Sequence, residues 1–131
     1  EGILVEDDDL VKNALRQLRS AGFRIALDDF GTGYSSLSYL RRFEVDKIKI
    51  DRSFVQHLGQ AMDSTAIVTA VVTLGHAMGL TVTAEGVETR EQLDFLNVAG
   101  CNELQGFLFS RAVPEGSLAE LLAPKDERAV A

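Results

Sequence analysis

The chain has 131 residues, of which 46% are hydrophobic and 25% charged, which is enough apolar content for the core of one soluble domain. Its formal net charge of −7 excludes electrostatically driven binding to duplex nucleic acid or to an anionic membrane surface, because both require basic patches. No apolar run is long enough to cross a bilayer, and the single cysteine, Cys101, excludes an internal disulfide and fits a reducing compartment such as the cytoplasm.

The first predicted element is an amphipathic helix over residues 7–21. Acids open this stretch, its apolar residues recur at helical spacing, and Gly22 ends it. Short apolar runs then predict strands over residues 23–27, 45–50, 80–84 and 104–110. Helical patterns follow these runs over residues 35–43, 53–58, 64–80, 89–99 and 115–122. Such alternation is typical of parallel strands with helical crossovers, so we expect an α/β fold of four strand-then-helix units.

Two α/β architectures fit this order, an open doubly wound sheet and an eight-stranded barrel. Both collect catalytic groups at the carboxyl ends of their strands. Acids follow three of the four apolar runs, and these acids are Asp28 with Asp29, Asp51, and Glu85. A complete barrel needs about 250 residues, so a barrel is expected to be incomplete here, with about four βα units. We expect one domain over residues 1–122 and a disordered tail over residues 123–131, which lacks apolar periodicity.

Carboxylates at parallel strand ends have two common uses, which are holding hard divalent cations and general acid-base catalysis. Asp28, Asp29 and Glu85 are open to both. Adjacent side chains of a regular strand face opposite ways, so the doublet reaches one site only where strand gives way to loop, as Phe30-Gly31 permits. One carboxylate bridging two cations while its neighbour binds the second would suit a two-metal hydrolase. The simpler interpretation is that the doublet caps the following loop.

Lys49 lies inside the apolar run at residues 45–50. Strand alternation places Ile48 and Ile50 on one face and Lys47 and Lys49 on the other. If the isoleucines pack against outer helices, Lys49 points into the barrel. There it would pair with the acids, orient water at a metal, bind a phosphate, or form a Schiff base as in a barrel aldolase. An exposed lysine on an edge strand is the alternative.

Beyond these patterns, four segments together resemble one protein family. They read DDFGTGYSSLSYLRR from Asp28, VDKIKIDRSFV from Val45, AEGVET from Ala84 and QGFLFSRAVP from Gln105. Their order and spacing are similar to those of EAL domains, the phosphodiesterases that linearise the bacterial second messenger cyclic di-GMP. The resemblance spans residues 23–114 and corresponds to the second half of the family's domain.

The resemblance implies a (β/α)8 barrel of the TIM type, here an incomplete one, and a two-metal mechanism. Members of the family use two Mg²⁺ or Mn²⁺ ions to activate water against one phosphodiester, and they release the linear dinucleotide pGpG. By position, Asp28 is implied to bridge the two metals, with Asp29 and Glu85 completing the second. Lys49 is implied to contact the water or phosphate at the metals, and Gln105 to shape the guanine and phosphate pocket.

Further positions are implied to lie near the site. Glu88, in AEGVET, matches a motif position close to it. The loop that couples dimerisation to metal binding in the family resembles residues 30–37, which include Phe30, Gly31, Thr32 and Gly33. Glu1 matches the last acid of the family's E-x-T-E string, which anchors that loop.

The family's Glu-Ala-Leu string and three ligands of its first metal would fall before Glu1. We therefore expect cyclic di-GMP hydrolysis in the parent protein and weak or no activity in the isolated chain, because cation affinity depends on ligand number and charge. The first alternative is a receptor that binds cyclic di-GMP without cleaving it. The second alternative is a Schiff-base aldolase that uses Lys49. Half a barrel exposes two sheet edges, so we also expect a homodimer or a domain-swapped assembly. Any membrane anchor of the parent is expected outside these residues.

Overall fold

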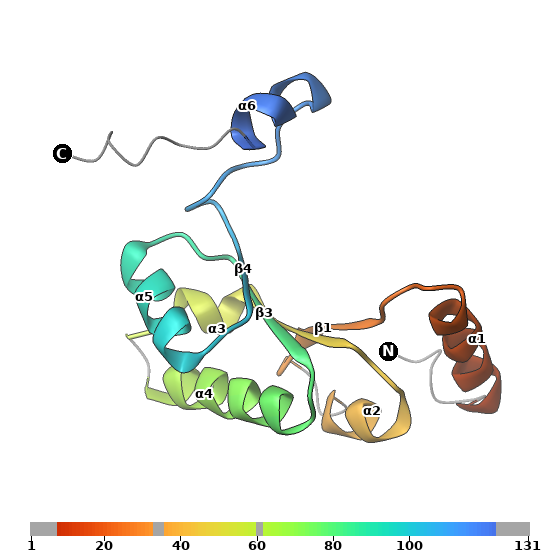
Figure 1. Ribbon diagram of the computed structural model, residues 1–131. Coiled ribbons are helices and arrows are strands. Elements are labelled where there is room, and N and C mark those ends of the chain that lie inside the picture. Colours follow the sequence, from red (N-terminus) through yellow and green to blue (C-terminus); the bar gives the residue numbers. More distant parts are fainter. Residues whose placement is uncertain (1–7, 33–35, 60–61, 123–131) are drawn as a thin grey trace.

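The computed structural model describes residues 8–32, 36–59 and 62–122. Four parallel strands form one sheet in the order β1-β2-β3-β4, and Figure 1 shows the strands and the helices between them. The strands are β1 (Ala26–Phe30), β2 (Lys47–Ile50), β3 (Thr81–Glu85) and β4 (Glu103–Gln105). The helices are α1 (Asp8–Ser20), α2 (Ser36–Arg42), α3 (Arg52–Gln56), α4 (Met62–Ala77), α5 (Arg90–Ala99), the 3-10 helix η2 (Glu115–Ser117) and α6 (Leu118–Leu122). The predicted α/β class and the four units are confirmed.

The hydrophobic core lies where α3 and α4 pack against β2 and β3. Ile48 and Ile50 of β2 are fully buried there, together with valines of α3, α4 and β3. Because β2 is a regular strand, Lys47 and Lys49 point to the opposite face and are only half-buried. The alternation predicted for this run is therefore confirmed, and one face of the sheet is left with polar side chains.

Two strands differ in extent from the apolar runs that predict them. β1 begins and ends three residues later than the predicted strand at residues 23–27, so it contains the acidic doublet. β4 has only three residues, against seven in the predicted strand at residues 104–110. Both differences have a tertiary cause: β1 continues because it pairs with β2 beyond a bulge, and β4 ends where the chain turns over the loop after β3.

The sheet has two edges, β1 and β4, which pair with no further strand in the part of the chain that the structure describes. Exposed large apolar side chains follow β4 toward the C-terminus, and they are Phe107, Phe109, Leu118, Leu121 and Leu122. Figure 1 shows α6 on a segment that leads away from the sheet, and α1 beyond β1 on the other side. Among the described residues, no helix combines the length and the apolar character that crossing a bilayer requires.

Candidate metal centre

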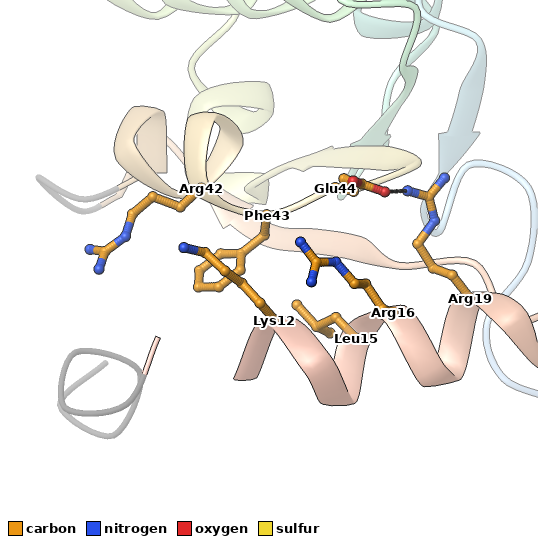
Figure 2. A pocket seen from close by; sticks show the side chains of 7 residues that line it. All are labelled: Lys12, Leu15, Arg16, Arg19, Arg42, Phe43 and Glu44. Atoms are coloured by element: carbon orange, nitrogen blue, oxygen red, sulfur yellow. Dashed lines mark hydrogen bonds and ion pairs between the residues drawn. The ribbon is translucent and has the colours of Figure 1, made fainter. Parts of the chain in front are cut away.

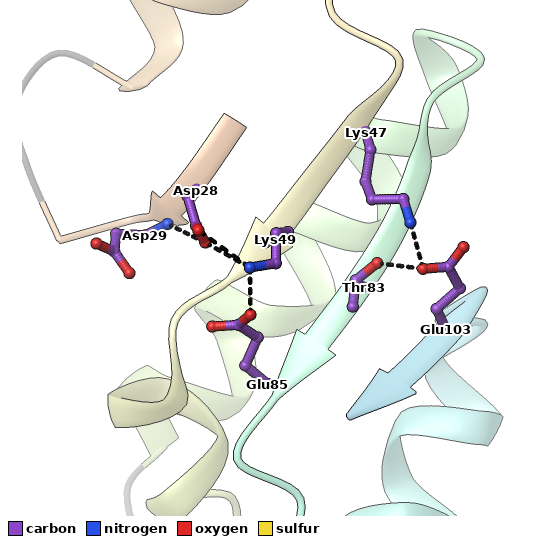
Figure 3. A network of polar contacts seen from close by, with 7 residues as sticks. All are labelled: Asp28, Asp29, Lys47, Lys49, Thr83, Glu85 and Glu103. Atoms are coloured by element: carbon purple, nitrogen blue, oxygen red, sulfur yellow. Dashed lines mark hydrogen bonds and ion pairs between the residues drawn. The ribbon is translucent and has the colours of Figure 1, made fainter. Parts of the chain in front are cut away.

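Three carboxylates from two strands meet at the carboxyl end of the sheet. Asp28 and Asp29 come from β1, and Glu85 is the last residue of β3. One carboxylate oxygen from each lies within 4.8 Å of the others. Figure 3 shows the ammonium of Lys49, which projects from β2, between Asp28 and Glu85, with the Asp29 carboxylate on the far side of Asp28. The strand-end acids that the sequence singles out are therefore brought together, whereas Asp51 instead caps α3 by accepting a hydrogen bond from Ser53 N at 2.9 Å.

A β-bulge lets the two neighbouring aspartates occupy the same edge of the sheet. Leu27 pairs with Ile48 and Phe30 with Ile50, so Asp28 and Asp29 together lie opposite the single residue Lys49. Asp29 has a φ of 51°, in the left-handed region that aspartate tolerates better than most residues other than glycine. Sequence reasoning expected the doublet to converge in a loop after the strand. The distortion instead lies inside β1, at the doublet itself.

Local hydrogen bonds hold the bulge in this shape. Asp29 N donates to Asp28 Oδ1 at 3.0 Å, and Thr32 Oγ1 donates to the Asp29 carbonyl at 2.9 Å. Gly31 follows with a φ of 102°, and a Cβ added to it would lie 2.8 Å from Phe54 Cε2. A larger residue than glycine would therefore be strained at this position and would press on α3.

Lys49 connects the two sides of the cluster. Its Nζ donates to both Asp28 oxygens at 3.0 Å and forms an ion pair with Glu85. The hydrogen bond to Glu85, followed by that to Asp28, raises the pKa of Lys49 against the opposing effect of burial. The amine is therefore charged at neutral pH, which disfavours the Schiff-base chemistry that needs a neutral lysine.

The chemistry of this donor set fits a hard divalent cation. All three donors are carboxylates, the class of ligand that Mg²⁺, Mn²⁺ and Ca²⁺ take. Three carboxylates against one ammonium leave about two negative charges in excess. That excess makes a cation favourable at this position, because it removes the repulsion between the acids.

A second polar group lies on the same face of the sheet, one pleat closer to the strand starts. Lys47 Nζ donates to Glu103 Oε2 at 2.5 Å, and Thr83 Oγ1 donates to the same oxygen at 2.8 Å (Figure 3). The hydrogen bond from Lys47 is the main cause that lowers the pKa of Glu103. We call Asp28, Asp29, Lys49 and Glu85 the terminal layer, and Lys47, Thr83 and Glu103 the middle layer.

Sequence reasoning assigned no role to the middle layer. The available signal was the period-two alternation of β2, which puts Lys47 on the face of Lys49. Its acidic partner, Glu103, is 56 residues away and belongs to a strand of three residues. No local pattern indicated that pairing.

Backbone hydrogen bonds join the loop after β3 to the end of β4. Val87 N donates to the Gln105 carbonyl and Leu108 N donates to the Val87 carbonyl, both at 3.0 Å. A Cβ on Gly106 would lie 2.1 Å from the Val87 carbonyl oxygen, so only glycine allows this approach. Gln105 is thereby fixed beside Glu85, its partner in the register of β3 and β4.

The remaining predicted residues lie outside the carboxylate cluster. Glu88 has an exposed side chain, and its N–H donates to Gln92 Oε1 at 2.8 Å where α5 begins. Phe30, expected in the loop, instead ends β1 and is buried in the core, because the strand continues through the bulge. Thr32 has the loop position expected of it, whereas Glu1, Gly33 and the tail at residues 123–131 lie outside the described residues.

Comparison with known protein families gives a match over most of the chain. Residues 1–112 match the model of the EAL domain. Over 123 residues the chain is 46% identical to the bifunctional diguanylate cyclase/cyclic di-GMP phosphodiesterase MucR of Pseudomonas aeruginosa, a match that covers 94% of this chain and 18% of that protein. The chain thus spans less than a fifth of this curated relative.

Solved structures show the same likeness in three dimensions. The EAL domain of Mycobacterium smegmatis DcpA is 44% identical with a TM-score of 0.86, and the match covers 94% of this chain and 55% of that one. Klebsiella pneumoniae BlrP1, solved as a complex with manganese and cyclic di-GMP, is 45% identical with a TM-score of 0.76, over 82% of this chain and 28% of that one. The four-stranded sheet is therefore part of a TIM-type barrel, as the sequence predicts.

Proposed function

Because this chain belongs to the EAL domain family, we propose that its acidic strand ends form part of a divalent-cation site that hydrolyses cyclic di-GMP to linear pGpG. The observation that carries the proposal is that Asp28, Asp29 and Glu85 lie within 4.8 Å of one another, with Lys49 paired to Asp28 and Glu85. Relatives of this sequence are named as cyclic di-GMP phosphodiesterases, and one solved relative is described as a complex with manganese and cyclic di-GMP. These names and the geometry support the same chemistry.

In this proposal the three carboxylates would hold Mg²⁺ or Mn²⁺, with Asp28 as a ligand of both ions and Asp29 and Glu85 as ligands of the second. Bound divalent cations would lower the pKa of a water molecule and neutralise the negative charge of the phosphate. The bulge in β1 brings both aspartates to one edge of the sheet, and Lys49 holds the carboxylates of Asp28 and Glu85.

The polar residues beside the acids are assigned to the substrate. Lys49 is charged and lies between the two sides of the cluster, so its ammonium would donate hydrogen bonds to a phosphodiester oxygen. Gln105 lies next to Glu85 with an exposed amide, which is suited to hydrogen bonding with the phosphate or a guanine edge. Glu88 and the loop at residues 30–33 would border the same site.

We expect the 131 residues by themselves to hydrolyse cyclic di-GMP slowly. The three carboxylates of the described cluster would be divided between two divalent cations, which leaves each ion few charged ligands from the protein, and cation affinity depends on ligand number and charge. The exposed edges β1 and β4 and the apolar side chains after β4 also suit self-association, so a homodimer or a domain-swapped assembly belongs to this proposal. A monomeric mass by light scattering across a range of concentrations would contradict that part.

One observation favours a second function, that of a receptor for cyclic di-GMP without cleavage. Lys49 already pairs with Asp28 and Glu85, so the charge of these two acids is partly neutralised before any cation binds. A receptor would bind the dinucleotide equally well with and without divalent cations. A phosphodiesterase would bind and cleave it only when they are present.

A hydrolysis assay separates these functions. The chain is incubated with cyclic di-GMP and either Mn²⁺ or a chelator, and pGpG is measured by chromatography over long times. Asp28→Asn is expected to abolish the Mn²⁺-dependent product, whereas Asp94→Asn, the same change at an exposed position on α5, is expected to leave it unaltered. The same assay on the intact parent protein decides the matter: binding of cyclic di-GMP by the parent without any pGpG in Mn²⁺ would reject the enzyme and support the receptor.

A further inference from the structure

The first turn of α3 lies where the chain leaves the sheet between two strands that carry carboxylates. β2 is flanked by β1 on one side and by β3 on the other. α3 begins directly after β2, with Asp51 as its cap. Asp29 lies near the end of β1, and Glu85 is the last residue of β3. The start of α3 is therefore placed to contact the loops that follow both of these strands.

On the side of β1, the ring of Phe54 lies against Gly31, which comes two residues after Asp29. A Cβ added to Gly31 would lie 2.8 Å from Phe54 Cε2 and 3.1 Å from Phe54 Cζ. Phe54 is half-buried and packs against the core. Because a packed interior leaves a ring little room to move aside, Gly31 rests on a fixed surface.

A closed turn connects Gly31 to Asp29. Thr32 N and Thr32 Oγ1 both donate to the Asp29 carbonyl, at 3.3 Å and 2.9 Å. Phe30, inside this turn, is buried in the core. A change in the position of Gly31 would therefore change the backbone position of Asp29.

On the side of β3, Gly86 directly follows Glu85 and approaches the beginning of α3. A Cβ added to Gly86 would lie 2.6 Å from Arg52 Cβ and 3.3 Å from Arg52 Cα. Gly86 also has a φ of 72°, in the region that favours glycine. One helical turn thus touches the loop after Asp29 and the residue after Glu85.

Asp29 depends on this support more than the other two acids of the cluster do. Lys49 donates to Asp28 and forms an ion pair with Glu85. By contrast, no side chain within residues 8–32, 36–59 and 62–122 forms a hydrogen bond or an ion pair with the Asp29 carboxylate. The neighbouring acids repel this carboxylate. Its position is therefore set by the backbone that carries it.

We propose that the first turn of α3, residues 51–54, is a spacer that sets the distance between Asp29 and Glu85, with Phe54 as the positioning residue for Asp29. This inference rests on the proposed cation site and goes beyond its ligands, because Phe54 and Arg52 act through the two loops and touch no cation. The distance matters because a divalent cation binds tightly only when its ligands are held in place around one centre.

The first test uses the full chain and measures Mn²⁺ affinity by isothermal titration calorimetry. Phe54→Leu keeps an apolar side chain but removes the ring edge under Gly31, and it is expected to lower the affinity about tenfold, as loss of an outer partner of a metal ligand does. Phe43→Leu is the matched control. Phe43 is also buried, but it lines a pocket between α1 and the segment before β2, at the other end of the strands (Figure 2). Its substitution is expected to change the affinity less than about twofold.

The second test needs no cation. Gly31→Ala is made in the wild type and in Phe54→Leu, and the thermal midpoints are compared. Since the added Cβ meets the ring only in the wild type, Gly31→Ala is expected to lower the midpoint less in the Phe54→Leu background. Equal decreases in the two backgrounds would contradict the contact on which the spacer depends.

Two results of the first test would overturn the proposal. Unchanged Mn²⁺ affinity in Phe54→Leu would mean that Phe54 does not position Asp29, and equal losses in the two phenylalanine variants would mean that general destabilisation is responsible. Circular dichroism checks that both variants are folded. A parent protein that yields no pGpG while Phe54→Leu still weakens Mn²⁺ binding selectively would reject the proposed hydrolysis and support the spacer.

Discussion

The terminal layer and the middle layer contain the same kind of ion pair but differ in charge balance. In the middle layer one lysine faces one glutamate, and Thr83 donates to that glutamate as well. In the terminal layer one lysine pairs with two carboxylates, Asp28 and Glu85, and the carboxylate of Asp29 lies within 4.8 Å of both. The two layers lie two residues apart on β2, so their different character comes from what β1 adds. Because the bulge contributes two aspartates in place of one residue, only the terminal layer has charge left for a cation.

The largest expected effect concerns Gly106, which directly follows β4, the strand that supplies Glu103 to the middle layer. Gly106→Ala would place a Cβ against the backbone of Val87, which cannot move aside as a side chain can. We expect a loss of about 3 kcal/mol in the free energy of unfolding, measured by denaturant titration. Gly116→Ala is the matched control, since a Cβ there meets nothing within 4 Å. Equal stability of the two variants would contradict the close packing of Gly106 against the backbone of Val87.

The second prediction compares the effect on Mn²⁺ affinity of substituting one glutamate in each layer. Glu85→Gln is expected to lower Mn²⁺ affinity by about tenfold to a hundredfold, the range seen when even an outer partner of a metal ligand is removed. Glu103→Gln makes the same chemical change in the middle layer and should leave Mn²⁺ affinity unaltered. Isothermal titration calorimetry measures both. If the two variants lose affinity equally, charge on the open face as a whole binds the cation, and the distinction between the layers fails.

The third prediction measures the ion pair of the middle layer. The side chains of Lys47 and Glu103 are 24% and 47% exposed to solvent, so solvent screens the attraction between them. A double-mutant cycle of Lys47→Met and Glu103→Gln is expected to give a coupling of less than about 1 kcal/mol. A coupling several times larger would mean that the sheet shields this pair far better than its exposure indicates.

The smallest expected effect is a pH dependence confined to acid. Hydrogen bonding from Lys47 lowers the pKa of Glu103 from its ordinary value of 4.5. The stabilisation that results is fully present above pH 4.5 and is lost as the pH falls through the lower folded-state pKa. The difference in thermal midpoint between the wild type and Glu103→Gln should therefore shrink in strong acid. A difference that stays constant from pH 7 to pH 3 would show that Glu103 is not stabilised as an anion.

Much of the fold follows from patterns that local sequence encodes. The helix predicted over residues 7–21 agrees with α1 to within one residue at each end, and the pattern over residues 89–99 is α5 preceded by its cap, Thr89. The alternation in β2 correctly assigns the isoleucines to the core. These features depend on neighbours within a few positions, which is why sequence periodicity predicts them.

The candidate site was predictable only as a set of residues. The positions of Asp28, Asp29 and Glu85 after apolar runs indicated that they would converge, and the structure brings them together. The bulge was not indicated, because a positive φ at Asp29 depends on pairing with β2 rather than on the doublet itself.

The sequence by itself determined the α/β class, the order of the elements, the family and the acidic residues at the strand ends. Each of these follows from the periodicity of apolar residues or from a sequence motif. Only the tertiary structure decided which lysine pairs with which acid, how close the three carboxylates lie, and why Gly106 has no substitute. Those outcomes depend on contacts between segments as far apart as Lys47 and Glu103, and such contacts exist only once the sheet has formed and the helices have packed against it.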